Sequence, residues 1–376
     1  MRQLAGTGAL QGEYEVTARV VDRTIAAAER LGLAEMAAEA LHTKGTVAFR
    51  LGRTWEGRAL IQGGLQLFEE AGNLDGVLRA NLFLATITAL DSPAQTLAFE
   101  QEAIALARRI GRRATEMITI NNSSEDARRT GDWAWAEGEI RAMLELDVDD
   151  SVRMQLELAI AYFEQAHGTL GPGAVSGFRT FLKGLDDTEL EASVLDLEAF
   201  EALLAADAAG AVRLFEKAAI TSDFNAPYLL PKMGRAAIVA RDADHARVAL
   251  ERMAVLAVRG RATEADRAVI RAGLLALDGD TAGAMVGYRT AMAGFHDLGL
   301  RWDEALLGLE VAFVLGMDDL ERSGWAEQSR ETMVSLGALP YLALLERALA
   351  RRSVAETRTE REPAEGAPEV RDSTTA

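Results

Sequence analysis

One short segment, Ile120–Met143, holds the pattern that most constrains the fold. It reads INNSSEDARRTGDWAWAEGEIRAM, which predicts two short helices joined by a tight turn at Gly131. Small or apolar residues stand at fixed distances before and after that glycine: Ile120, Ser124, Ala127, Ala136, Ile140 and Met143. Residues at i, i+4 and i+7 share one face of a helix. The segment therefore predicts a helical hairpin with small residues between its two helices.

The same offsets recur around four other turn residues: Gly52, Ala206, Arg241 and Gly279. The residues at these offsets are again small or apolar: Leu41, Gly45, Ala48, Gly57, Ile61 and Gly64; Leu195, Ala199, Ala202, Ala211, Phe215 and Ala218; Leu230, Gly234, Ala237, Ala246, Leu250 and Met253; Ala268, Ala272, Leu275, Ala284, Tyr288 and Ala291. The gaps between successive turns are 79, 75, 35 and 38 residues. The two long gaps are double periods, with a degenerate repeat near Asp91 and another near Gly171.

A final unit turns near Asp318, and Leu339–Arg351 reads as a capping helix, so the sequence predicts about eight hairpins. The fold class that follows is all-α, a right-handed superhelix in which each hairpin contacts mainly its neighbours. We expect residues 1–11 to be the remnant of a preceding helix or a linker, because they resemble the last turns of a helix. Residues 12–351 form the repeat domain, and the charged residues 352–376 form a disordered acidic tail.

Two helix starts carry capping signals. Ser92, Pro93 and Gln95 have the spacing of an N-cap, a first helical residue and a reciprocal capping side chain. Thr263 and Asp266 have similar spacing. Both positions are therefore predicted to begin a helix.

Composition limits the classes of function. The formal net charge of −18 disfavours direct contact with nucleic acid, which needs clustered Lys and Arg, and disfavours an anionic membrane surface. The chain has no cysteine, which excludes disulfides and zinc–thiolate sites. No apolar stretch approaches the ~20 residues of a membrane span, so we expect a cytoplasmic protein.

The pattern resembles the tetratricopeptide repeat, with small residues on both sides of the turn and an aromatic or aliphatic residue deep in the second helix. It departs from that repeat in lacking the closing proline and in having several units of 38–40 residues. The stretch FHDLGLRWDEALLGLEVAFVLG, followed by ETMVSLGALPYLALLERAL, is similar to the end of such arrays in actinobacterial class III nucleotidyl cyclase and helix-turn-helix ATPase regulators. The resemblance implies a regulatory array, the C-terminal part of a larger bacterial signalling protein.

No catalytic, metal or cofactor signature accompanies the repeats. Gly6–Gly12 resembles a phosphate loop, but no strand precedes it and its spacing is one residue too long. The acidic run Asp278–Asp280 lacks the closing carboxylate of a calcium loop, because Arg289 stands there. The four histidines lie far apart in the chain. We therefore predict a protein that is not an enzyme and needs no cofactor or metal.

The candidates for function are therefore residues on the surface of the array. In tetratricopeptide-like arrays the first helix of each hairpin lines a concave groove, here at residues ten, six and three before each turn. That rule selects His42, Thr46, Phe49, Asn121, Glu125, Arg128, Asp196, Phe200, Leu203, Arg235 and Ile238. We take His42, Asn121, Glu125, Arg128 and Arg235 as candidates for binding a protein or peptide, in trans or in cis with a missing N-terminal module.

Two alternatives stay open. These positions can be ordinary solvated groove residues with no partner. They can also form an active site in the concave surface of an α/α framework, in which case Arg128→Ala or Glu125→Ala abolishes turnover.

Overall fold

The computed structural model describes residues 20–359 apart from 184, 186, 257–259 and 317–318, with side-chain surroundings up to residue 350. All regular secondary structure in this part of the chain is α-helical, which confirms the predicted fold class. Consecutive helices pack against one another along the chain, as in an α-solenoid. The right-handedness of the superhelix stays a prediction.

A helix over residues 20–31 comes first among the described residues, and eight hairpins and a last helix follow. The hairpins are α2 (Ala34–Arg50) with α3 (Thr54–Ala71), α4 (Leu74–Thr88) with α5 (Pro93–Arg109), α6 (Arg113–Thr130) with α7 (Trp133–Leu144), α8 (Asp150–His167) with α9 (Ala174–Leu182), α10 (Thr188–Leu204) with α11 (Ala208–Thr221), α12 (Ala226–Val239) with α13 (Ala243–Val255), α14 (Arg261–Leu277) with α15 (Thr281–Asp297), and α16 (Arg301–Val314) with α17 (Leu320–Ser335); the last helix is α18 (Leu339–Thr359).

The five turn residues identified from the sequence share one backbone conformation. Gly52, Gly131 and Gly279 have φ of 78°, 87° and 87°, and Ala206 and Arg241 have φ of 65° and 58°. A left-handed residue after a helix lets the last carbonyls find donors while the chain reverses. Glycine adopts this conformation without steric cost, whereas alanine and arginine do not. The turn geometry is therefore retained even where the glycine is not.

Small residues lie where the two helices of a hairpin cross, as predicted. A Cβ atom on Gly57 of α3 would lie only 2.8 Å from the carbonyl oxygen of Gly45 on α2. In the α6–α7 hairpin, Ala127 and Ala136 are almost completely buried, and Ile140 fills the space beside them. Larger side chains at these positions would hold the helix axes apart.

The predicted helix starts are only partly correct. Pro93 is the first residue of α5 and Ser92 its N-cap residue, but Ser92 makes no side-chain cap bond. Gln95 instead accepts a hydrogen bond from Arg58 of α3, at 2.8 Å. The prediction for Thr263 is wrong, because α14 begins two residues earlier, at Arg261. Thr263 is in the first turn, and its hydroxyl donates to the Leu90 carbonyl.

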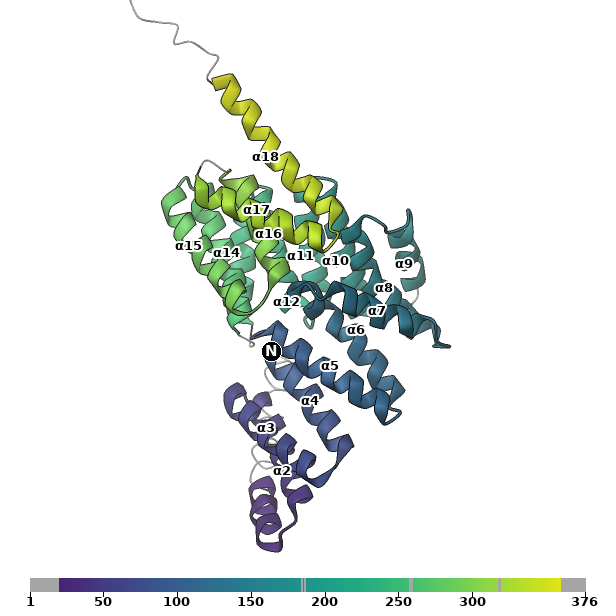
Figure 1. Cartoon of the computed structure of the whole chain (residues 1–376). Helices are drawn as coiled ribbons and strands as arrows, with labels where there is room; N and C mark the ends of the chain where they lie inside the picture. Colours follow the sequence, from purple (N-terminus) through teal and green to yellow (C-terminus); the bar gives the residue numbers. More distant parts are fainter. Residues whose placement is uncertain (1–19, 184, 186, 257–259, 317–318, 360–376) are drawn as a thin grey trace, which may run out of the picture.

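The solenoid closes on itself, which the sequence did not predict. Figure 1 shows α2–α5, which we call the arm, extending from a compact body formed by α6–α18. Within the body, α16 contacts α6, and α18 contacts α8, so the last hairpins pack against the first ones.

Three contacts between segments 170 residues apart mark this closure, which we call the seam. Asp91 pairs with Arg261, with Oδ2 and Nη2 3.0 Å apart. Gly131 lies against Arg301, so that a Cβ on the glycine would be 3.7 Å from the arginine Cβ. His167 donates from Nδ1 to the Gly337 carbonyl at 3.1 Å. In each contact a turn within a hairpin meets a connection between hairpins of the second half, so one superhelical turn takes between four and five hairpins.

The predicted ends of the repeat domain cannot all be compared with the structure. Residues 1–11, the start of the first predicted helix, and most of the predicted tail lie outside the described residues. The capping helix α18 continues to Thr359, beyond the predicted boundary at Arg351. None of the described helices combines the length and the apolar composition that a bilayer-spanning segment requires.

The turn conformation generates a stability prediction. We expect Ala206→Gly to raise the free energy of unfolding by about 1 kcal/mol, because it removes the steric cost of a left-handed alanine. Urea unfolding followed by circular dichroism measures it. Ala205→Gly is the matched control, since Ala205 has a φ of −76°. That control should lower stability, and a gain from both substitutions would contradict the account.

Candidate functional site

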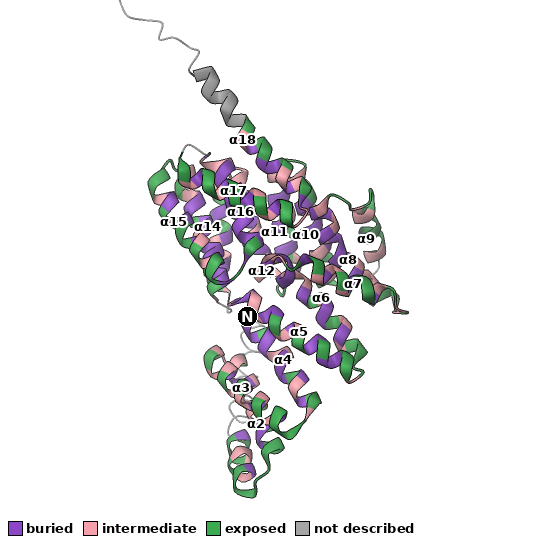
Figure 2. Ribbon diagram, viewed as in Figure 1, coloured by how far each residue is buried: buried purple, intermediate pink, exposed green. Residues whose placement is uncertain are grey.

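The first helices of the body hairpins bring their charged side chains together inside the closed superhelix. Helix α16 contacts α6, α12 and α14, and α18 contacts α8, α10 and α16. Figure 2 shows that α12 and α16, in the middle of the body, are largely buried. We call the charged residues that meet here the luminal cluster: Glu125, Arg128, Arg129, Asp196, Lys232, Arg235, Asp266, Asp303 and Glu310.

One half of the luminal cluster surrounds Glu125. This carboxylate forms an ion pair with Arg128, one helical turn away, and lies 3.5 Å from Lys232 Nζ on α12. Lys232 also pairs with Asp196 on α10, at 2.9 Å. The Arg128 guanidinium lies over the Tyr162 ring, 4.8 Å from its centroid, which favours a desolvated cation. Three helices are thus joined by charges in the interior.

The other half of the cluster is centred on two arginines. Arg129 Nε lies 2.8 Å from Asp303 on α16, and its Nη2 lies 3.2 Å from Asp266 on α14. Arg235 Nε lies 3.1 Å from Glu310 on α16. Arg235 Nη1 also lies 3.6 Å from Asp303, so the two arginines share this carboxylate.

Burial and neighbouring charges move the pKa values of these carboxyl groups in opposite directions. Burial would raise the pKa of Glu125, but Arg128, Lys232 and Arg129 together lower it to about 2. Burial raises the pKa of Glu310 to about 7 in spite of Arg235. Burial likewise raises the pKa of Asp266 to about 6, against the opposing effect of Arg129. Separated carboxyl pKa values of this kind often mark functional sites, but structural ion-pair networks produce them too.

The structure brings together three of the five candidate residues. Glu125, Arg128 and Arg235 lie in the luminal cluster, and Asp196, which the same groove rule selected, joins them. Asn121 lies half-buried on α6, one turn before Glu125, outside the cluster. His42 lies on α2 in the arm, 5.7 Å from the Phe83 ring between centroids. Whether any of the five binds a partner stays a prediction.

Sequence reasoning missed four residues of the luminal cluster: Arg129, Asp266, Asp303 and Glu310. Arg129 was outside the groove rule because it lies only two residues before the turn. Asp266 was interpreted as a capping residue, and Asp303 and Glu310 lie in a repeat whose register was not assigned. The unusual burial of five carboxylates and four cations is visible only once α16 is placed against α6.

Two buried acidic residues without an ion pair lie beside the luminal cluster. Glu100 of α5 and Asp126 of α6 are both buried, and each is outside every ion pair among the described residues. Glu100 Oε2 has no hydrogen-bond partner in that part of the chain. Burial and the nearby Asp126 raise the pKa of Glu100, and burial likewise raises that of Asp126 against the opposing effect of Arg129.

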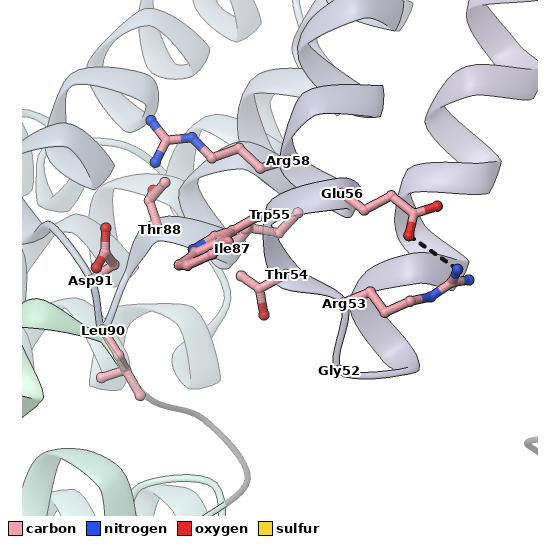
Figure 3. Close-up of a pocket in the computed structure, with 10 residues that line it drawn as sticks. All are labelled: Gly52, Arg53, Thr54, Trp55, Glu56, Arg58, Ile87, Thr88, Leu90 and Asp91. Atoms are coloured by element: carbon pink, nitrogen blue, oxygen red, sulfur yellow. Dashed lines mark ion pairs between the residues drawn. The ribbon is translucent and has the colours of Figure 1, made fainter.

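The arm, in contrast, has an open pocket. A pocket of about 420 Å³ lies between the start of α3 and the α4–α5 turn. Its lining residues are Gly52, Arg53, Thr54, Trp55, Glu56, Arg58, Ile87, Thr88, Leu90 and Asp91. Figure 3 shows Arg53 and Glu56 paired with each other at one end and Leu90 and Asp91 at the other. Trp55 lies between them and is 89% exposed.

The first helices of the arm also present aromatic side chains. Phe49 of α2 and Phe83 of α4 form an edge-to-face pair with centroids 5.9 Å apart, and both rings are half-buried. His42 contacts the same Phe83 ring. Its Nε2 atom is buried without a hydrogen-bond partner among the described residues, and burial lowers the pKa of His42. These positions are the arm's equivalent of the luminal cluster, without its charges.

Comparisons with known proteins give no family. No protein-family model matches the chain, and no curated protein is significantly similar to it in sequence. Among the described residues, no three His, Asp or Glu side chains are placed to hold a metal ion. The function must therefore be inferred from the arrangement of the helices and their side chains.

The raised pKa of Glu100 generates a pH prediction. A carboxyl group whose pKa is raised in the folded state lowers the stability of the protein as pH rises. The loss begins at the pKa of the same group in the unfolded chain, near 4.5. We expect Glu100→Gln to be more stable than the wild type at pH 9, because the neutral amide avoids the cost of burying a charged carboxylate. The gain should shrink as pH falls to 5.

Urea unfolding at pH 5, 7 and 9 measures this difference. Glu102→Gln is the matched control, because Glu102 is on the exposed side of the same helix. A difference from wild type that stays constant with pH, or that appears equally in the control, would show that Glu100 holds no proton.

Proposed function

We propose that this chain is a tetratricopeptide-like interaction array that binds a protein or peptide through its arm, in the setting of a larger bacterial signalling regulator. The observation that carries the proposal is the contrast between the body and the arm. The body closes its concave face with its own α16 and α18, whereas the arm keeps a pocket and an exposed tryptophan at its hairpin turns. The resemblance to arrays of nucleotidyl cyclase and ATPase regulators supplies the setting.

The side chains of the arm pocket are suited to a polypeptide partner. Tryptophan and arginine contribute most of the binding energy in many protein interfaces, and Trp55 and Arg58 both line this pocket. Ile87 and Leu90 supply apolar lining, and Arg53 and Glu56 supply both signs of charge at the rim. A pocket lined by three apolar and six polar or charged side chains fits an anchoring side chain of a bound helix or loop that also makes polar contacts.

The luminal cluster supports a structural role better than the alternative of an active site. Arg129 already binds carboxylates on α14 and α16, and Arg235 binds two carboxylates on α16, so a substrate would have to displace existing ion pairs. Its members are largely buried, with side-chain exposures from 3% at Glu310 to 29% at Glu125. A partner that reached Arg128 or Arg235 would first have to separate α16 from α6.

Substitution of the exposed tryptophan tests the proposal. We expect Trp55→Ala to reduce capture of the partner from extracts of the source cells by roughly thirtyfold, because removing an anchoring aromatic costs about 2 kcal/mol. The full chain is immobilised, and captured proteins are quantified by mass spectrometry. Arg58→Ala should reduce the capture of the same protein.

Phe224→Ala is the matched control, since Phe224 is 69% exposed on the α11–α12 connection, away from the pocket residues. It should leave capture unchanged. If no protein depends on Trp55 and Arg58, or if Phe224→Ala removes the same protein, the arm pocket is not the binding site.

A further inference from the structure

The charged side chains of the arm pocket leave one arginine without a carboxylate partner. Arg53 and Glu56 form an ion pair, with Nη1 and Oε2 3.0 Å apart. Asp91 is bound by the guanidinium of Arg261 across the seam. Arg58, the remaining charged lining residue, belongs to no ion pair with the part of the chain that the structure describes. The pocket therefore keeps one positive charge once its ion pairs are counted.

Asp91 is close enough to Arg58 to respond to its charge, but Arg261 holds this carboxylate. Burial would raise the pKa of Asp91, whereas the hydrogen bonds from Arg261, and after them the charge of Arg58, lower it. Arg261 binds the carboxylate with its backbone N–H as well as its guanidinium. Two arginines thus lie near one carboxylate, and only Arg261 is bonded to it.

The guanidinium of Arg58 has donors left for a ligand. It carries five N–H groups, and Nη2 donates to Gln95 Oε1 at 2.8 Å. Its other N–H groups have no acceptor among the described residues. Figure 3 shows this guanidinium on the opposite side of Trp55 from the Arg53–Glu56 pair. A fork of donors in this position suits a carboxylate, which brings two acceptor oxygens.

The surroundings of Arg58 differ from those of other unpaired arginines. Arg50 and Arg109 also form no ion pair with a described residue, but both are exposed, so water solvates their charges. Arg58 is half-buried. Carboxylates are plentiful in a chain of 58 acidic and 40 basic residues, and Arg79 of the same arm pairs with Glu39. A carboxylate from outside the chain would supply the partner that Arg58 lacks.

Apolar surface lies beside this cation. Trp55 is 89% exposed, and Ile87 and Leu90 line the same pocket. The hydroxyl group of Thr88 is already hydrogen-bonded within the arm, so it does not replace Arg58 as a donor to a ligand. A segment that fits this pocket must therefore combine an apolar side chain with a nearby carboxylate.

We propose that the arm pocket recognises an acidic segment of its partner, in which an Asp or Glu side chain binds Arg58 and a neighbouring apolar side chain packs on Trp55. This inference rests on the proposed function of the pocket and names the chemistry of the partner. Arg58 then decides which sign of charge the pocket accepts, and Trp55 supplies the apolar contact. The net charge of −18 does not prevent the pairing, because charges farther away than about 8 Å are largely screened at physiological ionic strength.

Peptide selection with a charge exchange tests the proposal. The full chain selects binders from a phage library of random peptides, and those that Trp55→Ala no longer binds are retained. We expect Asp and Glu beside an apolar residue to be enriched over the starting library. With Arg58→Glu as the target, Lys and Arg should be enriched in their place, because the charge that the pocket presents is reversed.

Affinities of synthetic peptides test the individual contact. The selected peptides are amidated at the C-terminus, so that side chains carry their only carboxylates, and binding is followed by fluorescence anisotropy. Arg58→Gln should weaken binding by about tenfold, because a hydrogen-bonded charged partner is lost. Changing the acidic residue of the peptide to its amide should weaken binding to the wild type by the same factor and change binding to Arg58→Gln little.

Arg213→Gln is the control, because Arg213 is exposed on α11, outside the arm, and should bind the peptides as the wild type does. Circular dichroism of each variant shows whether the fold is retained. Trp55-dependent peptides without acidic enrichment, or an amide change that weakens binding to the wild type and to Arg58→Gln equally, would overturn this inference alone. A selection that yields no Trp55-dependent peptide would overturn the proposed function with it, so the two failures are distinguishable.

Discussion

Arg129 makes the interaction on which the closed body depends. From α6 it binds Asp303 on α16 and Asp266 on α14, and so joins helices whose contacting residues are separated by 174 and 137 positions. Its side chain is only 12% exposed. Removing two opposite charges from water costs nearly as much as their attraction returns, so such a pair adds little net stability. What it contributes is specificity, because any other placement of α16 takes Asp303 from Arg129 and both carboxylate partners from the buried Arg235.

This closure divides the chain into parts with different roles. In an open solenoid the concave face is free for a ligand, but here α16 and α18 pack into that face along α6–α14. Beside the charges, Trp133 and Trp302 pack with ring centroids 4.8 Å apart, and Tyr341 packs on Trp302. Helices of the same chain therefore fill the concave face of the body, whereas the arm offers another molecule the pocket at its hairpin turns.

Local features of the fold were predictable from the sequence, and the closure was not. The offsets around Gly131 identified the hairpins, their turns and their small packing residues, because these depend on neighbours within about 40 residues. The groove rule also found Glu125, Arg128 and Arg235 and placed them on inward-facing positions. It could not show that the groove is closed, since that depends on contacts such as Asp91 with Arg261. Asp266 was interpreted as a helix cap because its ion pair with Arg129 also joins residues far apart in the sequence.

The most direct test of the closed body is a disulfide across the seam. The chain has no cysteine, so Gly131→Cys with Arg301→Cys supplies its only two thiols. A Cβ on residue 131 would be 3.7 Å from that of residue 301, within the range of disulfides. Mild oxidation of the folded protein should give an intramolecular disulfide that increases mobility on a non-reducing denaturing gel. Thiols that stay free while circular dichroism shows an intact fold would contradict the account.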